Sequence, residues 1–284
     1  MSDLTEDRLE PWLAAMRPRL HSFCGRMMGS AVDGEDAVQE ALARAAASYA
    51  RSVPIAQPEA WLFRIARNAA IDMLRQRRGG TLPIADGEDV DAGAESSSRV
   101  AVMLGFSAFL PLPPPQRAAV VLVDVLGYSA AEAATILETS VPAIKAALHR
   151  GRTRLGSPSE PEMAAVDERE KLRLRAYADL FNAREFDALR DLLAADVRLD
   201  LPAKIKLAGK RDVSVYFGRY SESDIAWRVK PALAEGRAVL LATNPDDISD
   251  RYIILLGWSD GRIITIRDFL HARYVMDGID IADI

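Results

Sequence analysis

Two stretches without hydrophobic periodicity interrupt this 284-residue chain and limit what it can fold into. Residues 79–100 are rich in glycine, serine and acidic residues, a composition typical of a flexible linker. Residues 157–164 carry turn residues and two prolines, which indicates a second, shorter linker. We therefore expect separate domains over residues 1–78, 101–156 and 165–284 rather than one continuous core.

The composition predicts a soluble protein of the cytoplasm. Hydrophobic residues make up 49% of the chain, enough for several cores, yet no apolar run approaches the roughly 20 residues that span a bilayer. The single cysteine, Cys24, excludes an internal disulfide framework. The acidic N-terminus lacks the pattern of a signal peptide. We expect no membrane association, no metal and no cofactor, because His21, His149 and His271 are scattered and no glycine-rich phosphate loop is present.

Residues 1–78 are expected to be helical. Between residues 33 and 49, apolar side chains recur at helical spacing, and acidic residues crowd the N-terminal end, where the helix dipole favours negative charge. The next helix begins at Pro58, in a first turn that tolerates proline. Its expected buried stripe contains Trp61, Leu62, Ile65, Ala69 and Met73.

A helix-turn-helix is expected within residues 101–156. Ser129 and Glu132 have the spacing of a capping box, which starts a helix that we expect to end near Leu137. A turn of three residues follows, and Ser140 caps a second helix that tolerates Pro142 in its first turn.

The second helix of this motif separates an apolar face from a basic one. Val141, Ile144, Leu148 and Leu155 share the inward stripe. The outward face combines small residues, which permit close approach to base edges, with cations that pair with phosphates. With the cap, the residues that we expect to contact duplex DNA are Ser140, Ala143, Lys145, Ala146, His149, Arg150 and Arg152, and Arg154 lies on the same face. The alternative is a solvated helix whose basic last turn complements the helix dipole.

Two blocks together resemble the extracytoplasmic-function (ECF) group of RNA polymerase sigma factors, in the sigma-70 superfamily. DGEDAVQEALARAAASY followed by AWLFRIARNAAIDMLRQRR is similar to the second region of that family. LPLPPPQRAAVVLVDVLGYSAAEAATILETSVPAIKAALHRGRTRL is similar to its fourth region. Ala147 and Pro142 depart from the usual pattern, and the acidic linker occupies the place of the third domain of housekeeping sigma factors.

The resemblance implies partners and roles. The partners would be core RNA polymerase, through the clamp helices of its largest subunit, and promoter DNA, with residues 141–155 reading the −35 element. The implied polymerase-docking residues are Asp33, Glu35, Asp36, Gln39 and Glu40, although these acids also suit a helix N-terminus. The implied contacts to the single-stranded −10 element are Arg51, Ser52, Arg64, Arg67, Arg75, Arg77 and Arg78. Trp61 and Phe63 are the nearby aromatic residues, and Trp61 is expected to belong to the core.

Residues 165–284 begin with helices and continue with strand-like runs, which predicts an α+β domain. Residues 258–261 indicate a hairpin turn between two of these strands. This part resembles the SnoaL-like, or nuclear-transport-factor-2-like, fold, a cone-shaped half-barrel with a pocket. The whole chain is thus expected to be a multidomain protein, with two all-α sigma domains, the second containing the helix-turn-helix, before the α+β SnoaL-like domain.

Some SnoaL-like relatives use Asp and His in the pocket for catalysis. The pocket candidates here are Asp200, Tyr216, Trp227, Trp258 and His271, together with Asp268. In a regular strand Asp268 and His271 would face opposite sides, which argues against an acid–base dyad.

The reading that we favour is therefore a sigma factor, not an enzyme, whose fused C-terminal domain modulates its activity and has a pocket suited to a small ligand. The alternatives are a helix-turn-helix regulator that recruits no polymerase, and a ligand-processing enzyme of the cyclase or isomerase kind with a DNA-binding leader.

Overall fold

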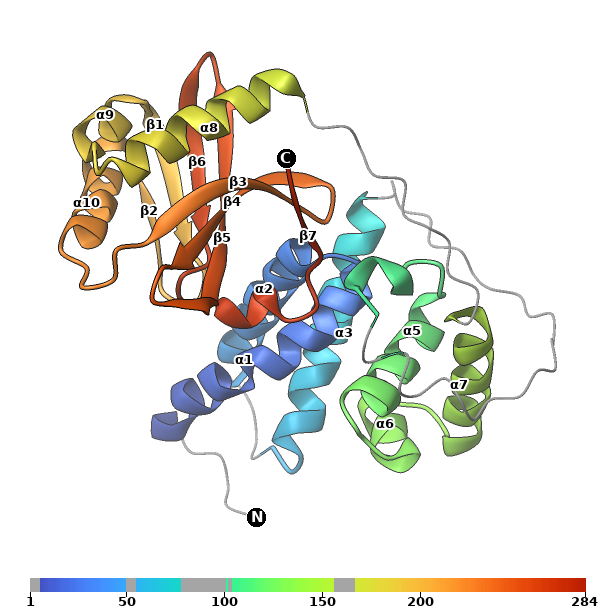
Figure 1. Ribbon diagram of the computed structural model, residues 1–284. Coiled ribbons are helices and arrows are strands. Elements are labelled where there is room, and N and C mark those ends of the chain that lie inside the picture. Colours follow the sequence, from blue (N-terminus) through green and yellow to red (C-terminus); the bar gives the residue numbers. More distant parts are fainter. Residues whose placement is uncertain (1–5, 50–54, 78–100, 102–103, 156–166) are drawn as a thin grey trace. The chain divides into compact units, whose positions relative to one another are not determined.

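The computed structural model describes residues 6–49, 55–77, 101, 104–155 and 167–284. Both expected linkers, residues 79–100 and 157–164, lie outside the described residues. The chain separates into two compact units, Met1–Pro161 and Glu162–Ile284. Figure 1 shows their elements in chain order, from the blue helices of the first unit to the orange and red strands of the second. Each unit is described by itself.

The first unit begins with a three-helix module. Its helices are α1 (Glu6–Met28), α2 (Ala31–Tyr49) and α3 (Pro58–Arg77). Of the stripe expected on α2, Val38, Leu42 and Ala45 are buried, while Tyr49 is half-buried. We call α1–α3 the first helical module.

The buried face of α3 differs from the predicted stripe. Leu62 and Ala69 are buried as expected, but the partly buried residues include Trp61, Ile65 and Met73. Phe63 is fully buried instead. The reason is that α3 packs on α1 and α2 with one side and on α6 with another, so its apolar face is wider than a single stripe.

The second helical module follows in the same unit. Its elements are the 3₁₀ helix η1 (Phe106–Phe109), α5 (Pro114–Val120), the π-helical turn η2 (Val121–Val125), α6 (Ala130–Leu137) and α7 (Val141–Leu155). Helix α7 packs on α5 and α6. Gly151 permits the approach to α5, because a Cβ at this position would lie 2.6 Å from Cγ2 of Val120.

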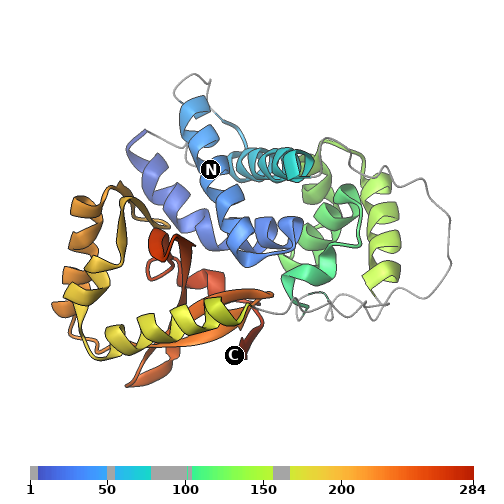
Figure 2. The ribbon, with the colours of Figure 1, turned by 90° about the horizontal axis from the view of Figure 1, so that it is seen from above.

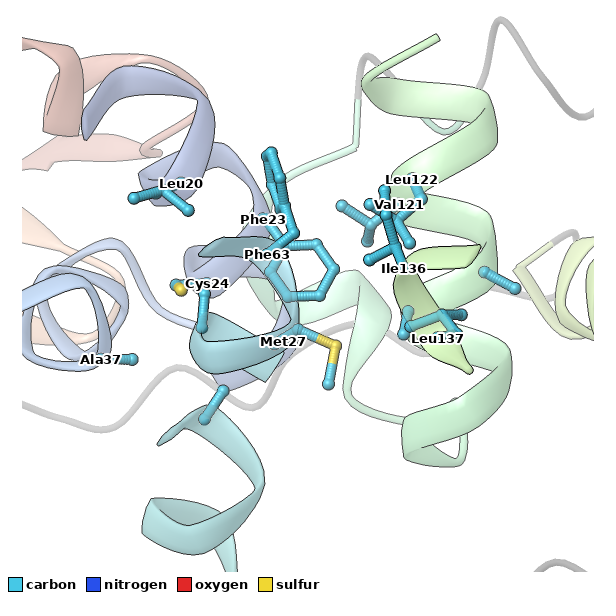
Figure 3. Packing of buried hydrophobic residues seen from close by; sticks show 14 of the residues in the cluster. Leu20, Phe23, Cys24, Met27, Ala37, Phe63, Val121, Leu122, Ile136 and Leu137 are labelled. Carbon is cyan, nitrogen blue, oxygen red and sulfur yellow. The ribbon is translucent and has the colours of Figure 1, made fainter. Parts of the chain in front are cut away.

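One apolar core runs through both helical modules. Phe23 and Phe63 of the first module face Val121, Leu122 and Ile136 of the second (Figure 3). All five side chains are at most 2% exposed. In Figure 2 the helices of the two modules lie side by side, in agreement with the contacts between α3 and α6 and between α1 and α5. The two modules are therefore packed as a single unit.

The second unit is an α+β domain, as predicted. Its helices are α8 (Glu168–Asn182), α9 (Phe186–Asp191) and α10 (Lys210–Ser221), with a 3₁₀ helix η3 (Arg273–Met276). Its strands are β1 (Leu193–Leu201), β2 (Ile205–Ala208), β3 (Arg228–Ala234), β4 (Arg237–Asn244), β5 (Asp247–Ser259), β6 (Arg262–Asp268) and β7 (Ile281–Asp283). The sheet has the order β2-β1-β6-β5-β4-β3-β7. Within it, β1 and β6 are parallel and the other neighbours antiparallel.

The helices of this domain cover the sheet. Helix α8 packs on β3 and β4, while α10 packs on β1 and β2 (Figure 1). The predicted hairpin turn between β5 and β6 is confirmed. Asp260 and Gly261 have φ values of 49° and 76°, the left-handed conformations that a two-residue type I′ turn requires.

Strand β6 is shorter than the run of alternating residues suggested. It ends at Asp268, and the chain then turns into η3 instead of continuing as a strand. The carboxylate of Asp268 accepts a hydrogen bond from the backbone N–H of Leu270 at 2.8 Å, a local contact that turns the chain away from the sheet. Asp268 and His271 therefore do not follow strand alternation, contrary to the sequence argument.

Candidate nucleic-acid interface

The start of the helix-turn-helix has the predicted capping box. The hydroxyl of Ser129 accepts a hydrogen bond from the backbone N–H of Glu132 at 3.2 Å, and the carboxylate of Glu132 accepts one from the N–H of Ser129 at 2.8 Å. These bonds lower the pKa of Glu132. Helix α6 ends at Leu137, and Glu138 adopts a left-handed conformation with φ 53° and ψ 49°. The predicted turn over residues 138–140 is therefore confirmed.

Helix α7 is placed as the sequence indicates. The hydroxyl of Ser140 accepts a hydrogen bond from the N–H of Ala143 at 3.3 Å and so caps the helix. Ile144, Leu148 and Leu155 are buried, but Val141 is 36% exposed. Because helical side chains lean towards the N-terminus, this first residue has no preceding turn to pack against.

The exposed face of α7 carries the residues that we expected to meet DNA. Ala143, Lys145 and Ala146 are exposed, while His149 and Arg150 are half-buried. The helix contains no acidic residue. Small side chains near its start and cations beyond them match what a helix lying in a major groove requires.

Arg152 has a structural partner that the sequence did not reveal. Its guanidinium donates two hydrogen bonds, of 2.9 and 2.6 Å, to the carboxylate of Asp124 in η2. The hydrogen bonds raise the pKa of Arg152, and the Asp124 side chain is only 1% exposed. Arg154 likewise donates to the side-chain oxygen of Gln116 at 2.9 Å. These two arginines fasten α7 to the rest of its module.

Helix α3 presents four of the predicted single-strand contacts. Arg64 donates to the carboxylate of Glu138 at 2.6 Å. Arg77 donates a hydrogen bond to Asp33 at 2.6 Å, and this bond raises the pKa of Arg77. Arg67 is half-buried and Arg75 is exposed. The remaining predictions, Arg51, Ser52 and Arg78, lie outside the described residues.

The cationic faces of α3 and α7 meet in one groove, which we call the shared groove. It has a volume of about 590 Å³. Arg67 and Arg75 line it from α3, while Ala143, Ala147 and Arg150 line it from α7. Candidate contacts to the single strand and to the duplex thus lie around the same cavity.

The acidic residues proposed for docking are divided between interior and surface. Asp33 and Glu35 are buried, and Glu35 accepts a hydrogen bond from Arg17 at 3.2 Å. Asp36 and Gln39 are half-buried and Glu40 is exposed. Asp33 and Glu35 therefore hold the module together in this structure. The sequence pattern could not distinguish this structural role from a role in docking.

The second unit contains a small pocket around a buried carboxylate. The hydroxyl of Tyr216 donates to Asp268 at 2.6 Å, and that of Tyr220 donates to the same oxygen. The hydroxyl groups of Tyr220 and Tyr252 are also hydrogen-bonded, at 2.6 Å. Burial raises the pKa of Asp268, while the bonds from the two tyrosines oppose that rise. The sequence signal for this tyrosine cluster was the spacing of Tyr216 and Tyr220, which are four residues apart and therefore share one face of α10.

Three of the five predicted pocket residues line this cavity of about 40 Å³. They are Tyr216, Trp227 and His271, and Asp268 lines it with them. Asp200 and Trp258 are not among its lining residues; Asp200 instead lies 3.5 Å from the guanidinium of Arg267. Burial is the largest cause that lowers the pKa of His271, and the positive charge of nearby Lys204 lowers it further.

Sites of other kinds do not emerge from the described residues. In that part of the chain, no three His, Cys, Asp or Glu side chains gather as a metal site would require. None of the described helices combines the length and apolarity needed to cross a membrane.

A capped helix-turn-helix with an acid-free outer face is the arrangement found in the helix-turn-helix class of DNA-binding proteins. Residues 12–79 match the Sigma-70 region 2 family, residues 109–155 the Sigma-70, region 4 family, and residues 174–266 the SnoaL-like domain family. The chain belongs to the ECF RNA polymerase sigma factors of the sigma-70 superfamily.

Several relatives share this family. The ECF RNA polymerase sigma factor SigG of Mycobacterium tuberculosis is 32% identical over 66% of this chain and 59% of its own length. The ECF RNA polymerase sigma factor EcfG of Rhodopseudomonas palustris is 33% identical over 54% of this chain and 86% of its own length. The crystal structure of Mycobacterium tuberculosis SigJ is 22% identical, with a TM-score of 0.37, over 95% of this chain and 99% of that one. The match thus spans less than two thirds of the SigG relative.

Proposed function

We propose that this protein directs core RNA polymerase to promoters and that its C-terminal domain modulates this activity. The observation that supports the proposal most is the acid-free face of α7, held in place by the Ser140 cap and by the Asp124–Arg152 pair. The presence of a first helical module with its own arginine-rich helix favours a sigma factor over a simple helix-turn-helix regulator. The relatives carry the name of sigma factors, which are not enzymes.

Each helical module has a proposed role. Residues 141–150 of α7 read the duplex −35 element, with Lys145 and Arg150 on the phosphates. The arginines of α3, with residues 51, 52 and 78, hold the single strand of the −10 element. Asp36, Gln39 and Glu40 dock on the clamp helices of the polymerase, because Glu40 is exposed and Asp36 and Gln39 are half-buried, whereas Asp33 and Glu35 are buried. The site of action is then the cytoplasm, where the polymerase works.

Residues 165–284 form the proposed regulatory domain. The proposed linker at residues 157–164 joins it to the domain at residues 101–156. A second proposed linker, residues 79–100, joins that domain to the first domain at residues 1–78. A pocket lined by Tyr216, Trp227 and His271 supports a small-molecule ligand. Its volume of about 40 Å³ suits only a few water molecules. A ligand would therefore act by widening the pocket, and it shifts activity only if it binds one state more tightly than the other.

Transcription in vitro tests this proposal. Purified core polymerase, genomic DNA fragments and the full-length protein are expected to give transcripts with discrete start sites, absent with core polymerase alone. A chain truncated after Leu155 is expected to initiate at the same sites with a different yield. No defined start with either chain would exclude the sigma function, and identical yields would exclude modulation by the C-terminal domain.

The duplex contacts give a second prediction. The double substitution Lys145→Ala and Arg150→Ala is expected to weaken binding to a mixed-sequence 30-base-pair duplex by roughly tenfold or more, and to reduce the slope of log K against log salt by about two. The measurement is fluorescence anisotropy at several salt concentrations. The matched control, Lys171→Ala with Arg175→Ala on α8, removes the same charge and should leave the slope unchanged. An unaltered slope in the α7 variant would remove these residues from the interface.

A further inference from the structure

The pocket of the second unit has a cationic edge in addition to the buried carboxyl group of Asp268. Arg219 of α10 and His271 line the pocket, and both are exposed. The guanidinium of Arg273 in η3 lies 5.2 Å from the centre of the ring of Trp227, which also lines the pocket. We call this exposed edge of the pocket the mouth.

Lys204 brings a further positive charge to the mouth from the turn between β1 and β2. The backbone N–H of Lys204 donates to the carbonyl of Leu201 at 2.9 Å, and Leu201 lines the pocket. Besides burial, which is the largest cause, the charges of Lys204, Arg219 and Arg273 lower the pKa of His271. Cations from three separate elements therefore lie close to one imidazole ring at the mouth.

Two of these cations are available to a ligand. Arg273 forms an ion pair with Asp250. Lys204 and Arg219 are exposed, and neither forms an ion pair within the part of the chain that the structure describes. Two uncompensated cations beside one cavity give a positive potential that attracts an anion.

The deep end of the pocket is poorly suited to a cation. The carboxylate of Asp268 accepts hydrogen bonds from the hydroxyls of Tyr216 and Tyr220 and from the backbone N–H of Leu270. A carboxylate has about four acceptor positions, so most of them are already filled. Burial raises the pKa of Asp268, which favours the neutral form of the group. The position that remains suits a neutral hydroxyl donor better than an ammonium group.

Aromatic and apolar walls connect the deep end with the mouth. The ring of Trp227 packs edge to face on that of Tyr252, with 4.9 Å between their centres. The cavity of about 40 Å³ has to widen for a ring to enter. Ser223 and His271 line it just beyond the ends of α10 and β6, so they can move without breaking the helix or the sheet.

We propose that this pocket binds an aromatic carboxylic acid, with the carboxylate on Lys204 and Arg219 and the ring against Trp227. A hydroxyl group opposite the carboxylate donates to Asp268. The ligand thus places its charge at the cationic mouth and its neutral donor at the buried carboxyl group. This inference rests on the proposed control of the sigma function by a ligand, but binding itself is a property of the free protein.

Titration of the free full-length protein with para-hydroxybenzoate tests the site. In nuclear magnetic resonance spectra of isotope-labelled protein, the indole N–H signal of Trp227 is expected to shift saturably. The indole signals of Trp12 and Trp61, which belong to the first unit, should stay unchanged. The neutral isostere para-hydroxybenzamide is expected to bind about tenfold more weakly, because it makes no charge-assisted hydrogen bonds at the mouth. An unshifted Trp227 signal, or equal binding of the two compounds, would overturn the proposal.

Substitutions at the mouth separate its charge from the fold of the domain. Arg219→Gln is expected to weaken the binding of para-hydroxybenzoate about fivefold and to leave that of para-hydroxybenzamide unchanged. Lys204→Gln should act in the same direction. The matched control is Arg211→Gln, which removes an exposed arginine from the same helix, α10, outside the pocket lining. An equal loss of affinity in the Arg211 variant, or none in the Arg219 variant, would exclude a carboxylate site at the mouth.

Transcription in vitro distinguishes a failure of this inference from a failure of the proposed function. Para-hydroxybenzoate is expected to change the yield with the full-length protein but not with the chain truncated after Leu155. If the acid bound at Trp227 and neither chain initiated transcription, the site would stand and the sigma function would fail. If both chains initiated but no acid bound, the ligand class proposed here would be wrong and the sigma function would stand.

Discussion

Replacing Asp268 with alanine is expected to destabilise the C-terminal domain by about 3–5 kcal/mol, because two buried donors and one part-buried donor lose their acceptor. These donors are the hydroxyls of Tyr216 and Tyr220 and the backbone N–H of Leu270. The carboxylate is 0% exposed, so water cannot replace it without entering the core. Hydrogen exchange of peptides from α10 and β6 in the full-length chain measures the loss. Unchanged protection in these peptides would contradict the prediction.

Asp200 provides the matched control. Its carboxylate lies 3.7 Å from Lys206 and 3.5 Å from Arg267 and is partly exposed. Asp200→Ala is therefore expected to cost less than about 1 kcal/mol. A larger effect at Asp200 than at Asp268 would mean that the tyrosine cluster is not what holds the domain together.

The same carboxyl group gives the domain a pH dependence of known sign. Burial is the largest influence and raises the pKa of Asp268 above its usual value. Between the unfolded value of about 3.9 and this raised pKa, the folded domain binds more protons than the unfolded chain. The contribution of this group to stability is full below the unfolded value and decreases as pH rises through the folded one. Asp268→Ala should remove this dependence, as denaturation at several pH values would show.

The helix-turn-helix was predictable because its determinants are local. Ser129 and Glu132 are three residues apart, and Ser140 precedes the helix that it caps. Such contacts depend on a few neighbouring residues and leave a pattern in the sequence. The same holds for the β5–β6 turn at Asp260 and Gly261.

The partners of charged residues were not predictable, because they lie far along the chain. Asp124 pairs with Arg152, 28 residues away, and Arg64 with Glu138, 74 residues away. A helical pattern shows which face is polar but not whether an arginine on that face has an internal partner. Arg152 and Arg150 both belong to the basic face expected from the sequence, and only the hydrogen bonds from Arg152 to Asp124 separate a structural arginine from a candidate phosphate contact.

Tertiary packing also decided how much of a polar helix is buried. The acids of α2 have the pattern of a solvated helix start, yet Glu35 is 0% exposed and paired with Arg17. Such a buried carboxylate is tolerated only because it is paired. Likewise Asp268 ends a strand that the alternation of residues appeared to extend, because its own carboxylate bonds the backbone of Leu270.

The close approach of α1 and α2 supports the last prediction. A Cβ at Gly34 would lie 2.4 Å from Cα and 2.5 Å from the backbone N of Gly25. Backbone atoms of a packed helix cannot rotate away as a side chain does, so both helices would have to move apart. Gly34→Ala is therefore expected to destabilise the first unit by about 3 kcal/mol or more, at the upper end of what overpacking costs. Thermal or urea denaturation of the full-length protein measures this loss.

Gly218 is the control that separates packing from helix propensity. It lies inside α10, and a Cβ there would have no atom within 4 Å. Gly218→Ala is expected to stabilise its own domain by about 0.5–1 kcal/mol, because alanine loses less backbone freedom than glycine. If Gly34→Ala were as harmless as Gly218→Ala, α1 and α2 would not lie as close as this structure places them. The position of α1, which carries Phe23 into the core between the two modules, would then need another explanation.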